Sequence, residues 1–294
     1  MIRLMKTTIC IILFCILGIE VASSQKQSSS KISVKNPEKT FIGAILKPES
    51  INKTDHEFVT ATLNPITISS ANLTMKSMEI VPSYKNMMDA VRKRVQEGAS
   101  LNQGHILFSA VQELKSYKDI SFHFGQTIDP DLYLGTKDGK KSKKTLVALI
   151  ISRSIISLDM DFPDELSSDK DILAQADKLI YIASVEIGRN ALVIVESDKD
   201  KKDVIAAVNE RLSQKKNRQA QTVSWSEAIL ANSIIRVVTP QDSHFEVTAP
   251  DDPIGDVWEY IYWQPTADDF GTPISFSAAS LKDNALFVNE YEIK

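Results

Sequence analysis

The amino-acid sequence predicts an α+β protein, and two observations carry that prediction. Runs with strand-type alternation, such as 119–125 and 179–185, recur along most of the chain. Runs with helical spacing of apolar residues, such as 84–97 and 203–212, lie between them. The composition is that of a globular chain, with 43% hydrophobic and 24% charged residues among 294, and no repeat of fixed period is present. The length suits one large domain or two smaller ones with a sizeable core.

The first 24 residues have the pattern of a secretory signal peptide. Arg3 and Lys6 supply a positive n-region, and residues 9–19 form an apolar h-region. Small residues at 22–24 mark a cleavage site before Gln25. The sequence therefore predicts a protein that is secreted as a soluble monomer.

Both cysteines of the chain, Cys10 and Cys15, lie inside this predicted signal peptide. A lipoprotein site at Cys15 is an alternative, but Phe14 stands where a small residue is expected. The cleaved chain would contain no cysteine, so its core must fold without disulfides. The polar residues 25–38 are expected to be a flexible leader, and residues 39–294 the folded core.

Strands and one helix are expected in the N-terminal half. In 84–97, Met87, Met88, Val91 and Val95 recur at helical spacing, and Gly98 is a plausible stop. The other expected elements are a strand over 40–46, a β-rich stretch over 58–74, a helix or strand over 106–115 and a strand over 119–125.

The C-terminal half is expected to contain long paired strands. Two apolar runs, 179–185 and 191–195, flank Gly188 and Arg189, which indicates paired strands with a bend at the glycine. The run 146–158 is apolar enough for a buried helix and β-branched enough for a strand, so its conformation stays open. The other expected elements are a loop and helix start over 159–171, a helix over 203–212, and strands over 234–238, 273–277 and 285–293.

Motifs that carry catalytic or ligand chemistry are missing. The sequence has no phosphate-binding glycine loop, no GxSxG elbow and no histidine pair at ligand spacing. Asp159 and Asp161 form a DxD pair, which can bind a metal or act as acid and base, but also fits an exposed strand end. We therefore expect no enzyme activity, no cofactor and no metal site.

Charge and aromatic clusters leave three further possibilities. The net charge of −4 argues against a nucleic-acid partner. The lysines of 137–144 could contact anionic lipid or nucleic acid, or could form a solvated turn. The aromatic run 258–263 fits either a membrane-interface belt or core packing.

Two segments, 127–158 and 203–231, combine apolar arms with a basic turn and commit to neither helix nor strand. The arms 146–156 and 221–231 reach the roughly 9–11 residues that a transmembrane β-strand needs. Within 222–226, one face is apolar and the other carries hydroxyl groups, as a pore wall requires. The alternative is that both segments are ordinary packing helices.

From about residue 36 to 294 the chain resembles the cholesterol-dependent (thiol-activated) cytolysins and their bacterial cytolysin-like relatives. The most specific match is 178–189, which ends in Ile-Gly-Arg, followed by the strand 191–196 and the segment 197–208. The further matches stand in the order of the family and cover 41–46, 120–125, 157–161, 225–230, 271–276 and 281–284.

The resemblance implies a bent antiparallel central sheet, of MACPF/cytolysin type, flanked by helical clusters that convert into two transmembrane β-hairpins per subunit. It places the sheet bend at Gly188 and Arg189 and the hairpins at about 127–156 and 203–231. The candidate hairpin residues are Leu146, Ile150, Ile156, Val204, Val208, Val223, Trp225 and Ile229. Because membrane burial satisfies hairpin backbones only in a closed barrel, many subunits must assemble.

The sequence also departs from the family pattern. The chain stops at Lys294, inside a strand that leads toward the membrane-binding domain of the family, so this domain and its cholesterol-recognition loops are expected to be absent. The tyrosine that precedes the family's Gly-Arg is Ile187 here. The paired glycines at the family's edge-strand turn are replaced by Thr239, Pro240, Gln241 and Asp242. Since Pro240 has no N–H group, it can itself keep this edge closed.

The resemblance therefore predicts a secreted pore-forming toxin component. It would assemble as a homo-oligomeric ring, or as a hetero-oligomer with a longer membrane-binding cytolysin-like protein, and insert into a target lipid bilayer. One alternative is a regulator or inhibitor that binds a full-length cytolysin without forming pores. A second alternative is an exported scaffold protein with no pore-forming role.

Overall fold

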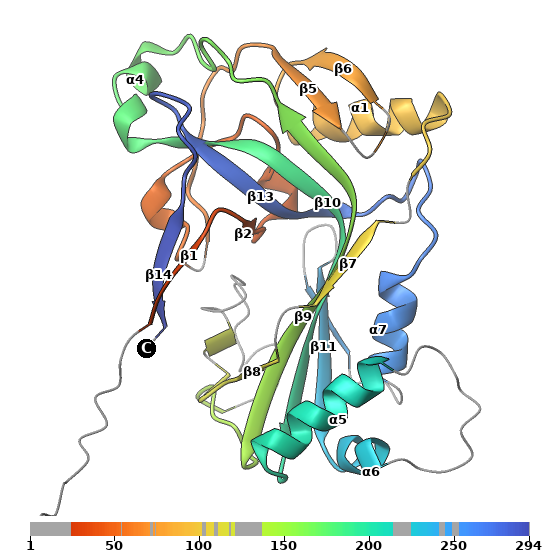
Figure 1. The fold of residues 1–294 in the computed structure, drawn as a ribbon. Helices are drawn as coiled ribbons and strands as arrows, with labels where there is room; N and C mark the ends of the chain where they lie inside the picture. Colours follow the sequence, from red (N-terminus) through yellow and green to blue (C-terminus); the bar gives the residue numbers. More distant parts are fainter. Residues whose placement is uncertain are drawn as a thin grey trace, which may run out of the picture.

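The computed structural model describes residues 25–53, 55–70, 73, 75–101, 104–108, 111–117, 119–120, 137–213, 225–240, 245–248 and 253–293. Two long strands run through most of the elongated molecule (Figure 1). β9 (Thr145–Met160) and β10 (Ile180–Ser197) pair antiparallel from Asp159 opposite Ser184 to Thr145 opposite Ser197. The run 146–158 is therefore a strand, and all of its β-branched residues except the partly buried Ile150 are buried, as expected for the centre of a sheet.

Helices lie at both ends of this strand pair (Figure 1). The upper half of the molecule carries α1 (Tyr84–Gln96) and α4 (Lys170–Leu173). The lower half carries α5 (Lys201–Ser213) and α6 (Trp225–Ala231), and α7 (Pro253–Ile261) packs beside β10 and β11. The predicted helices over 84–97 and 203–212 are confirmed as α1 and α5.

The neighbours of the long pair change between the two halves. Along one side of β10, β13 (Thr272–Ser280) pairs in the upper half and β11 (Ile234–Pro240) in the lower half. On the side of β9 that faces away from β10, β7 (His105–Phe108) and β8 (Gln112–Glu113) pair with it. β12 (Phe245–Thr248) pairs with the outer edge of β11. All the strand pairings described are antiparallel, which confirms the predicted α+β class with an antiparallel sheet.

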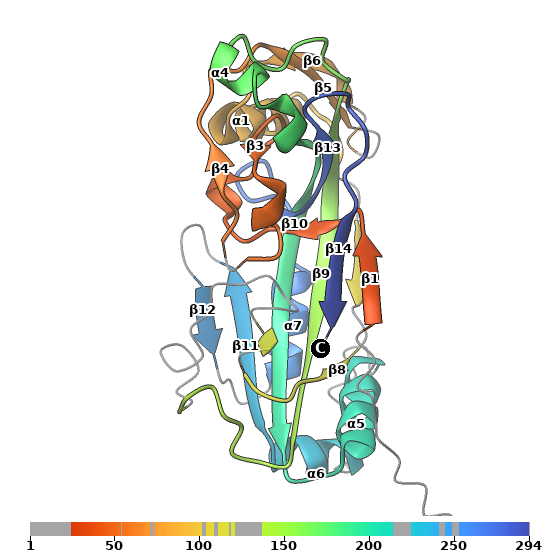
Figure 2. The same cartoon turned by 90° about the vertical axis from the view of Figure 1, so that its left-hand side faces the viewer.

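Short strands complete the upper half (Figure 2). β5 (Ile66–Ser70) pairs with the end of β9 and with β6 (Met75–Ile80). β3 (Ile45–Leu46) pairs with β10 and with β4 (Phe58–Val59), and β2 (Ile32–Ser33) pairs with β13. Three single 3-10 turns are η1 (Pro37–Lys39), η2 (Pro48–Ser50) and η3 (Ala176–Lys178).

Residues 25–38 are not a flexible leader, so this expectation was wrong. β1 (Gln25–Ser29) pairs with β14 (Asn289–Ile293) along all five residues. Ile32 and Val34 are buried in the upper core. Polar composition misled the prediction because backbone pairing with a distant strand does not depend on apolar side chains.

β10 changes its neighbour at Gly188, and the backbones come unusually close there. The pairing with β13 ends at Gly188 opposite Thr272, and the pairing with β11 begins at Leu192. The register with β9 shifts between Ile187 and Gly188. A Cβ atom on Gly188 would lie 1.9 Å from the carbonyl oxygen of Arg153, so only glycine fits at this position.

Gly271 approaches the same point from β13's side. Its φ is +88°, and a Cβ atom there would lie 2.2 Å from the carbonyl oxygen of Gly188. We expect Gly271→Ala to lower the free energy of unfolding by about 3 kcal/mol or more, because it adds a backbone clash to an unfavourable φ. Gly98→Ala is the matched control, since Gly98 has φ +98° but no atom within 4 Å of its added Cβ; about 1 kcal/mol is expected from φ alone. Equal losses in denaturant titrations of both variants would contradict the close approach.

The lower half of the sheet is covered on both faces. Because successive residues of a strand point to opposite faces, the side chains of β9 divide into two sets. Val147, Leu149 and Ile151 pack under α5, α6 and α7, on what we call the helix-covered face. Leu146 and Ala148 pack under the segment that follows β8, on what we call the loop-covered face. The upper core is a third, separate cluster.

Candidate functional site

Two long connections leave the lower end of the sheet. One links β8 to β9 through 115–144, and the other links β10 to β11 through 198–233. In each case the connection joins strands that lie next to each other and run antiparallel. Each connection has 30 residues or more, whereas an ordinary hairpin loop has about 2–5. Each is therefore long enough to extend its two flanking strands as a single hairpin.

Apolar contacts hold the described parts of both connections against the sheet. In the second connection, Val204 and Val208 of α5 are fully buried, and Ile229 of α6 is 4% exposed. On the loop-covered face, Leu114, just before the first connection, and Ile120 within it are buried. Thus the two connections cover opposite faces of the same four-stranded region, β11-β10-β9-β8.

The segment expected to form the first hairpin, 127–156, falls partly in a strand that is already formed. Residues 127–136 lie outside the described residues, and 145–156 already belong to β9 in the centre of the sheet. Leu146 and Ile150 face the loop-covered side, while Ile156 lies in the upper core. The arm 146–156 therefore does not need to change from helix to strand, because β10 already pairs with it. The long connection that precedes β9 covers 115–144.

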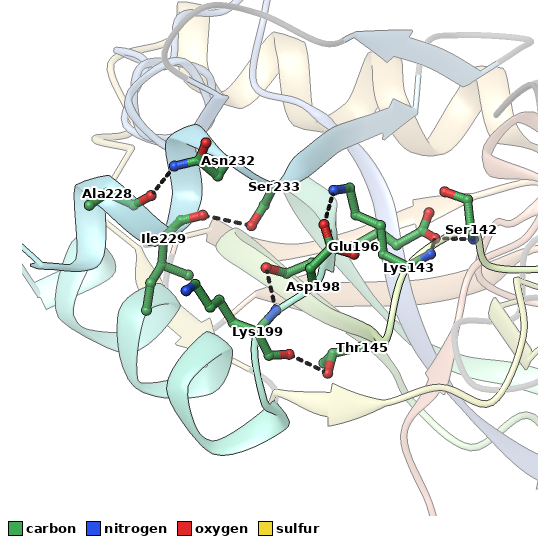
Figure 3. A network of polar contacts seen from close by, with 11 residues as sticks. Ser142, Lys143, Thr145, Glu196, Asp198, Lys199, Ala228, Ile229, Asn232 and Ser233 are labelled. Atoms are coloured by element: carbon green, nitrogen blue, oxygen red, sulfur yellow. Dashed lines mark hydrogen bonds and ion pairs between the residues drawn. The ribbon is translucent and has the colours of Figure 1, made fainter.

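The described part of the segment expected to form the second hairpin, 203–231, is helical. α5 covers most of its first arm, and α6 begins at Trp225, whose side chain is 53% exposed. Val223 lies outside the described residues. Asn232 and Ser233 end α6 by hydrogen-bonding the carbonyl oxygens of Ala228 and Ile229, each at 2.8 Å (Figure 3).

A buried carboxylate joins the two connections at the lower end of β10. Glu196 is 2% exposed and accepts a hydrogen bond of 2.6 Å from the Tyr117 hydroxyl. Its other oxygen accepts from the backbone N–H groups of Ser142 and Lys143 (Figure 3). Arg236 of β11 donates to the Tyr117 oxygen at 3.2 Å. We call these five residues the basal network.

The electrostatics of the basal network favour an ionised Glu196. Burial raises the pKa of Glu196, but hydrogen bonds from Tyr117, Lys143 and Ser142 outweigh it and hold the pKa below its usual range. Burial, followed by the hydrogen bond to Glu196, raises the pKa of the Tyr117 hydroxyl, which stays protonated and donates. The carboxylate thus fixes the first connection to the strand from which the second one starts.

Ion pairs surround this network at the surface. Lys143 lies 2.5 Å from Asp198, and Lys144 pairs with Asp200. The Thr145 hydroxyl donates to the carbonyl oxygen of Lys199 at 2.7 Å (Figure 3). These contacts place the basic turn of the first connection directly beside the start of the second.

Two arginines on the central strands hold the end of α7. Arg153 of β9 and Arg189 of β10 are direct cross-strand neighbours. Arg153 is 6% exposed and donates to the carbonyl oxygens of Ile261, at 3.2 Å, and Trp263, at 2.8 Å. Burial lowers the pKa of Arg153. We call this arrangement, with the contacts of Arg189 below, the arginine clasp.

Arg189 completes the clasp at the bend. Its guanidinium donates to the carbonyl oxygen of Tyr260 at 3.1 Å and to the carboxylate of Asp269 at 2.5 Å. The same group lies over the Trp263 ring, 4.2 Å from the ring centroid. Because the carbonyl oxygens at a helix C-terminus carry partial negative charge, they suit two adjacent cations.

The aromatic run 258–263 therefore belongs to α7 and its end. Trp258 and Ile261 are buried against the helix-covered face, whereas Tyr262 is 42% exposed. Of the two interpretations of this run, core packing therefore applies to its buried side chains, which include Trp258.

The expected edge-strand turn is only partly within the described residues. Thr239 and Pro240 are the last residues of β11, opposite Glu246 and Phe245 of β12. Gln241 and Asp242 lie outside the described residues. β12 is followed in the chain by α7, whose end the clasp holds.

The remaining polar candidates form no assembled site in the described part of the chain. Burial, then the charge of Glu186, raises the pKa of Asp159. Burial lowers the pKa of His56 to about 3, so this histidine is neutral between its aromatic neighbours Phe58 and Phe276. Among the residues described, no group of three or more potential metal ligands gathers. Nor does any described helix have the length and apolar character to cross a membrane.

This architecture is the fold of the cholesterol-dependent cytolysins. A pneumolysin structure matches with a TM-score of 0.74 and 18% identity, over 92% of this chain and 63% of that one. The human-specific toxin intermedilysin matches with a TM-score of 0.70 and 19% identity over the same shares. A non-hemolytic pneumolysin from Streptococcus pneumoniae matches with a TM-score of 0.67 and 17% identity, also over the same shares.

This chain thus spans about 63% of the length of these toxins, and the likeness concerns the fold. No protein-family model and no curated protein sequence matches the chain.

Sequence reasoning missed Glu196, Arg153 and Tyr117. The available signal was a charged residue inside an apolar strand run, since such a residue is rarely buried without partners. The partners themselves lie 53 to 119 positions away in the chain, and no local pattern identifies them.

Proposed function

We propose that the protein is an exported pore-forming component whose two connections, 115–144 and 198–233, convert into membrane-inserting β-hairpins. The observation that carries this proposal is their shared topology. Both leave the same end of the sheet, and each joins neighbouring antiparallel strands. Extension of these strands would add new residues to existing ladders without any change of strand order. The cytolysin fold supports the same class of function.

Conversion in a membrane requires assembly, because a lone pair of hairpins leaves open edges. The two available edges are β11, once β12 is removed, and the strands β7 and β8 on the other side. β12 covers only 237–240 of β11, and within the described residues no strand lies beside the outer edge of 234–236. The neighbour that supplies the second edge is a second copy of this chain or a longer cytolysin-like chain.

One observation favours a second candidate function. Pro240 lies at the outer edge of β11 and offers no N–H to an incoming strand. A chain that binds at one edge but extends poorly from the other would cap a growing ring. This would make the protein an inhibitor of a full-length cytolysin, and the match to a non-hemolytic pneumolysin is compatible with that role.

The test is a reversible disulfide that holds β12 on β11, which we call the β12 lock. In a background with Cys10 and Cys15 replaced by serine, we would introduce Val237→Cys/Thr248→Cys or Val238→Cys/Val247→Cys. These are successive cross-strand pairs, so one of them has the closer spacing that suits a disulfide. We expect the oxidised lock to abolish dye leakage from vesicles and a reductant to restore it. Gln27→Cys/Tyr291→Cys, in the β1–β14 ribbon, is the control lock and should leave leakage intact.

Three outcomes separate the candidates. Leakage by the oxidised β12 lock equal to that of the reduced protein would contradict edge opening. No leakage by the unlocked protein alone, together with no leakage beyond that of a full-length cytolysin when the two are mixed, would overturn pore formation. Suppression of that cytolysin's own leakage would establish the inhibitor instead.

A further inference from the structure

The lower end of the molecule carries a concentration of lysines that neither connection forms alone. The turn of the first connection contributes five, and the start of the second contributes three. We call this set the basic end; it consists of Lys137, Lys140, Lys141, Lys143, Lys144, Lys199, Lys201 and Lys202. Lys143 pairs with Asp198 (Figure 3), and Lys144 pairs with Asp200, so the two groups lie side by side.

Charge at this end is opposite in sign to that of the chain as a whole. The carboxylates within these two turns and in ion pairs with their lysines are Glu113, Asp138, Asp198, Asp200 and Asp203, and the buried Glu196 adds a sixth, so the eight lysines exceed them by two. The whole chain, in contrast, has a net charge of −4. The surplus is therefore a local property of the surface.

Three of these lysines are available to a partner. Four ion pairs engage Lys140, Lys143, Lys144 and Lys201, and Lys141 donates to the carbonyl oxygen of Lys144. Lys137, Lys199 and Lys202 are exposed, and among the described residues their ammonium groups have no ion-pair partner. Flexible, exposed ammonium groups suit a surface of anionic headgroups, where position along the surface is not fixed.

We propose that the basic end is a docking surface for anionic phospholipid bilayers. The basic end lies where both connections leave the sheet. If the proposed function holds, contact with a bilayer there would place the two hairpin-forming connections next to the lipid headgroups. Headgroup phosphates also compete for Lys143 and Lys144, whose carboxylate partners are more than two-thirds exposed and therefore weakly bound. Docking thus separates the turn at 142–144 from the turn at 198–200.

Binding is measured apart from pore formation by using the oxidised Val238→Cys/Val247→Cys lock, in which β12 stays on β11. Vesicles of phosphatidylcholine with added phosphatidylglycerol are compared with phosphatidylcholine alone in flotation assays. We expect the locked protein to float with the anionic vesicles only. Added salt at about 1 M should release it, because the Debye length falls to about 3 Å.

The variant pair Lys199→Glu/Lys202→Glu tests the surface itself. Each lysine near an anionic membrane raises the binding affinity by a factor of roughly 5. Replacement of two lysines by glutamates removes both contributions and adds repulsion, so the affinity should fall by about 25-fold or more. Lys170→Glu/Lys178→Glu makes the same charge change on exposed residues of the upper half and should bind as the parent does.

Equal losses in both variants, or flotation with neutral vesicles to the same extent, would overturn the proposal. Tighter binding to duplex DNA than to anionic vesicles would also overturn it, in favour of a nucleic-acid surface. Failure of leakage with intact flotation would contradict the proposed function and leave the docking surface standing.

Discussion

Replacement of Arg153 by methionine is expected to lower the free energy of unfolding by about 2–4 kcal/mol. The side chain is 6% exposed, and its guanidinium donates to two carbonyl oxygens at the end of α7, those of Ile261 and Trp263. Methionine fills part of the space but offers no donor, so both carbonyl oxygens lose this partner in a buried position. Arg153→Lys keeps the charge without the planar fork and should lose less. Denaturant titration of the three proteins measures the order.

The same replacement should act locally on α7 and on the strand before it. Because α7 follows β12 in the chain, loss of the clasp loosens the cover of β11. Hydrogen exchange should therefore accelerate in α7 and in the β11–β12 pair, and stay unchanged in α1. Uniform acceleration over the whole molecule, or stability within about 0.5 kcal/mol of the parent, would contradict the clasp.

Glu196→Gln is expected to lower the free energy of unfolding by about 2–3 kcal/mol at neutral pH. The carboxylate accepts from Tyr117, Ser142 and Lys143, and hydrogen bonds to a charged acceptor are the stronger kind. Glutamine retains one acceptor oxygen but turns an amide group toward a donor. The first connection should then separate from β10 more readily, and proteolysis at the lysines of 137–144 should increase.

The pH dependence of this effect follows from the direction of the pKa shift. Since the pKa of Glu196 in the folded protein lies below its ordinary value of 4.5, its stabilisation is present above that value and is lost as the pH falls through the folded pKa. The difference in unfolding free energy between wild type and Glu196→Gln should be constant near neutral pH and shrink in acid. A difference that grows on acidification would contradict an ionised Glu196 in the folded state.

The sequence predicted the parts of the fold that local patterns determine. The helical spacing in 84–97 and 203–212 identified α1 and α5, because one face of each must be apolar. The run 146–158 stayed ambiguous because a strand buried on both faces has no alternation to distinguish it from a buried helix. The strands that pair with it, β10 on one side and β7 on the other, make it a strand, and both lie elsewhere in the chain.

The site was less predictable for the same reason. Arg153 stands in an apolar run, which indicates a buried cation, but the carbonyl oxygens that accept its hydrogen bonds lie at the end of α7, more than 100 positions later. The hairpin boundaries depended on which residues already lie in the sheet, and hydrophobicity cannot separate a strand in place from an arm that is still to form. The prominence of Gly188 between two strand runs, in contrast, is a local signal, and the structure places this residue where β10 changes neighbours.

The change of neighbours at Gly188 has a consequence for folding cooperativity. Above it, β10 contributes to the upper core, and below it, to the two clusters of the lower half. A single strand is thus shared by two packing units that have few apolar side chains in common. Large rearrangement of one unit can proceed while the other keeps its tertiary structure, and heat absorption would then fall into two calorimetric transitions joined by one continuous strand.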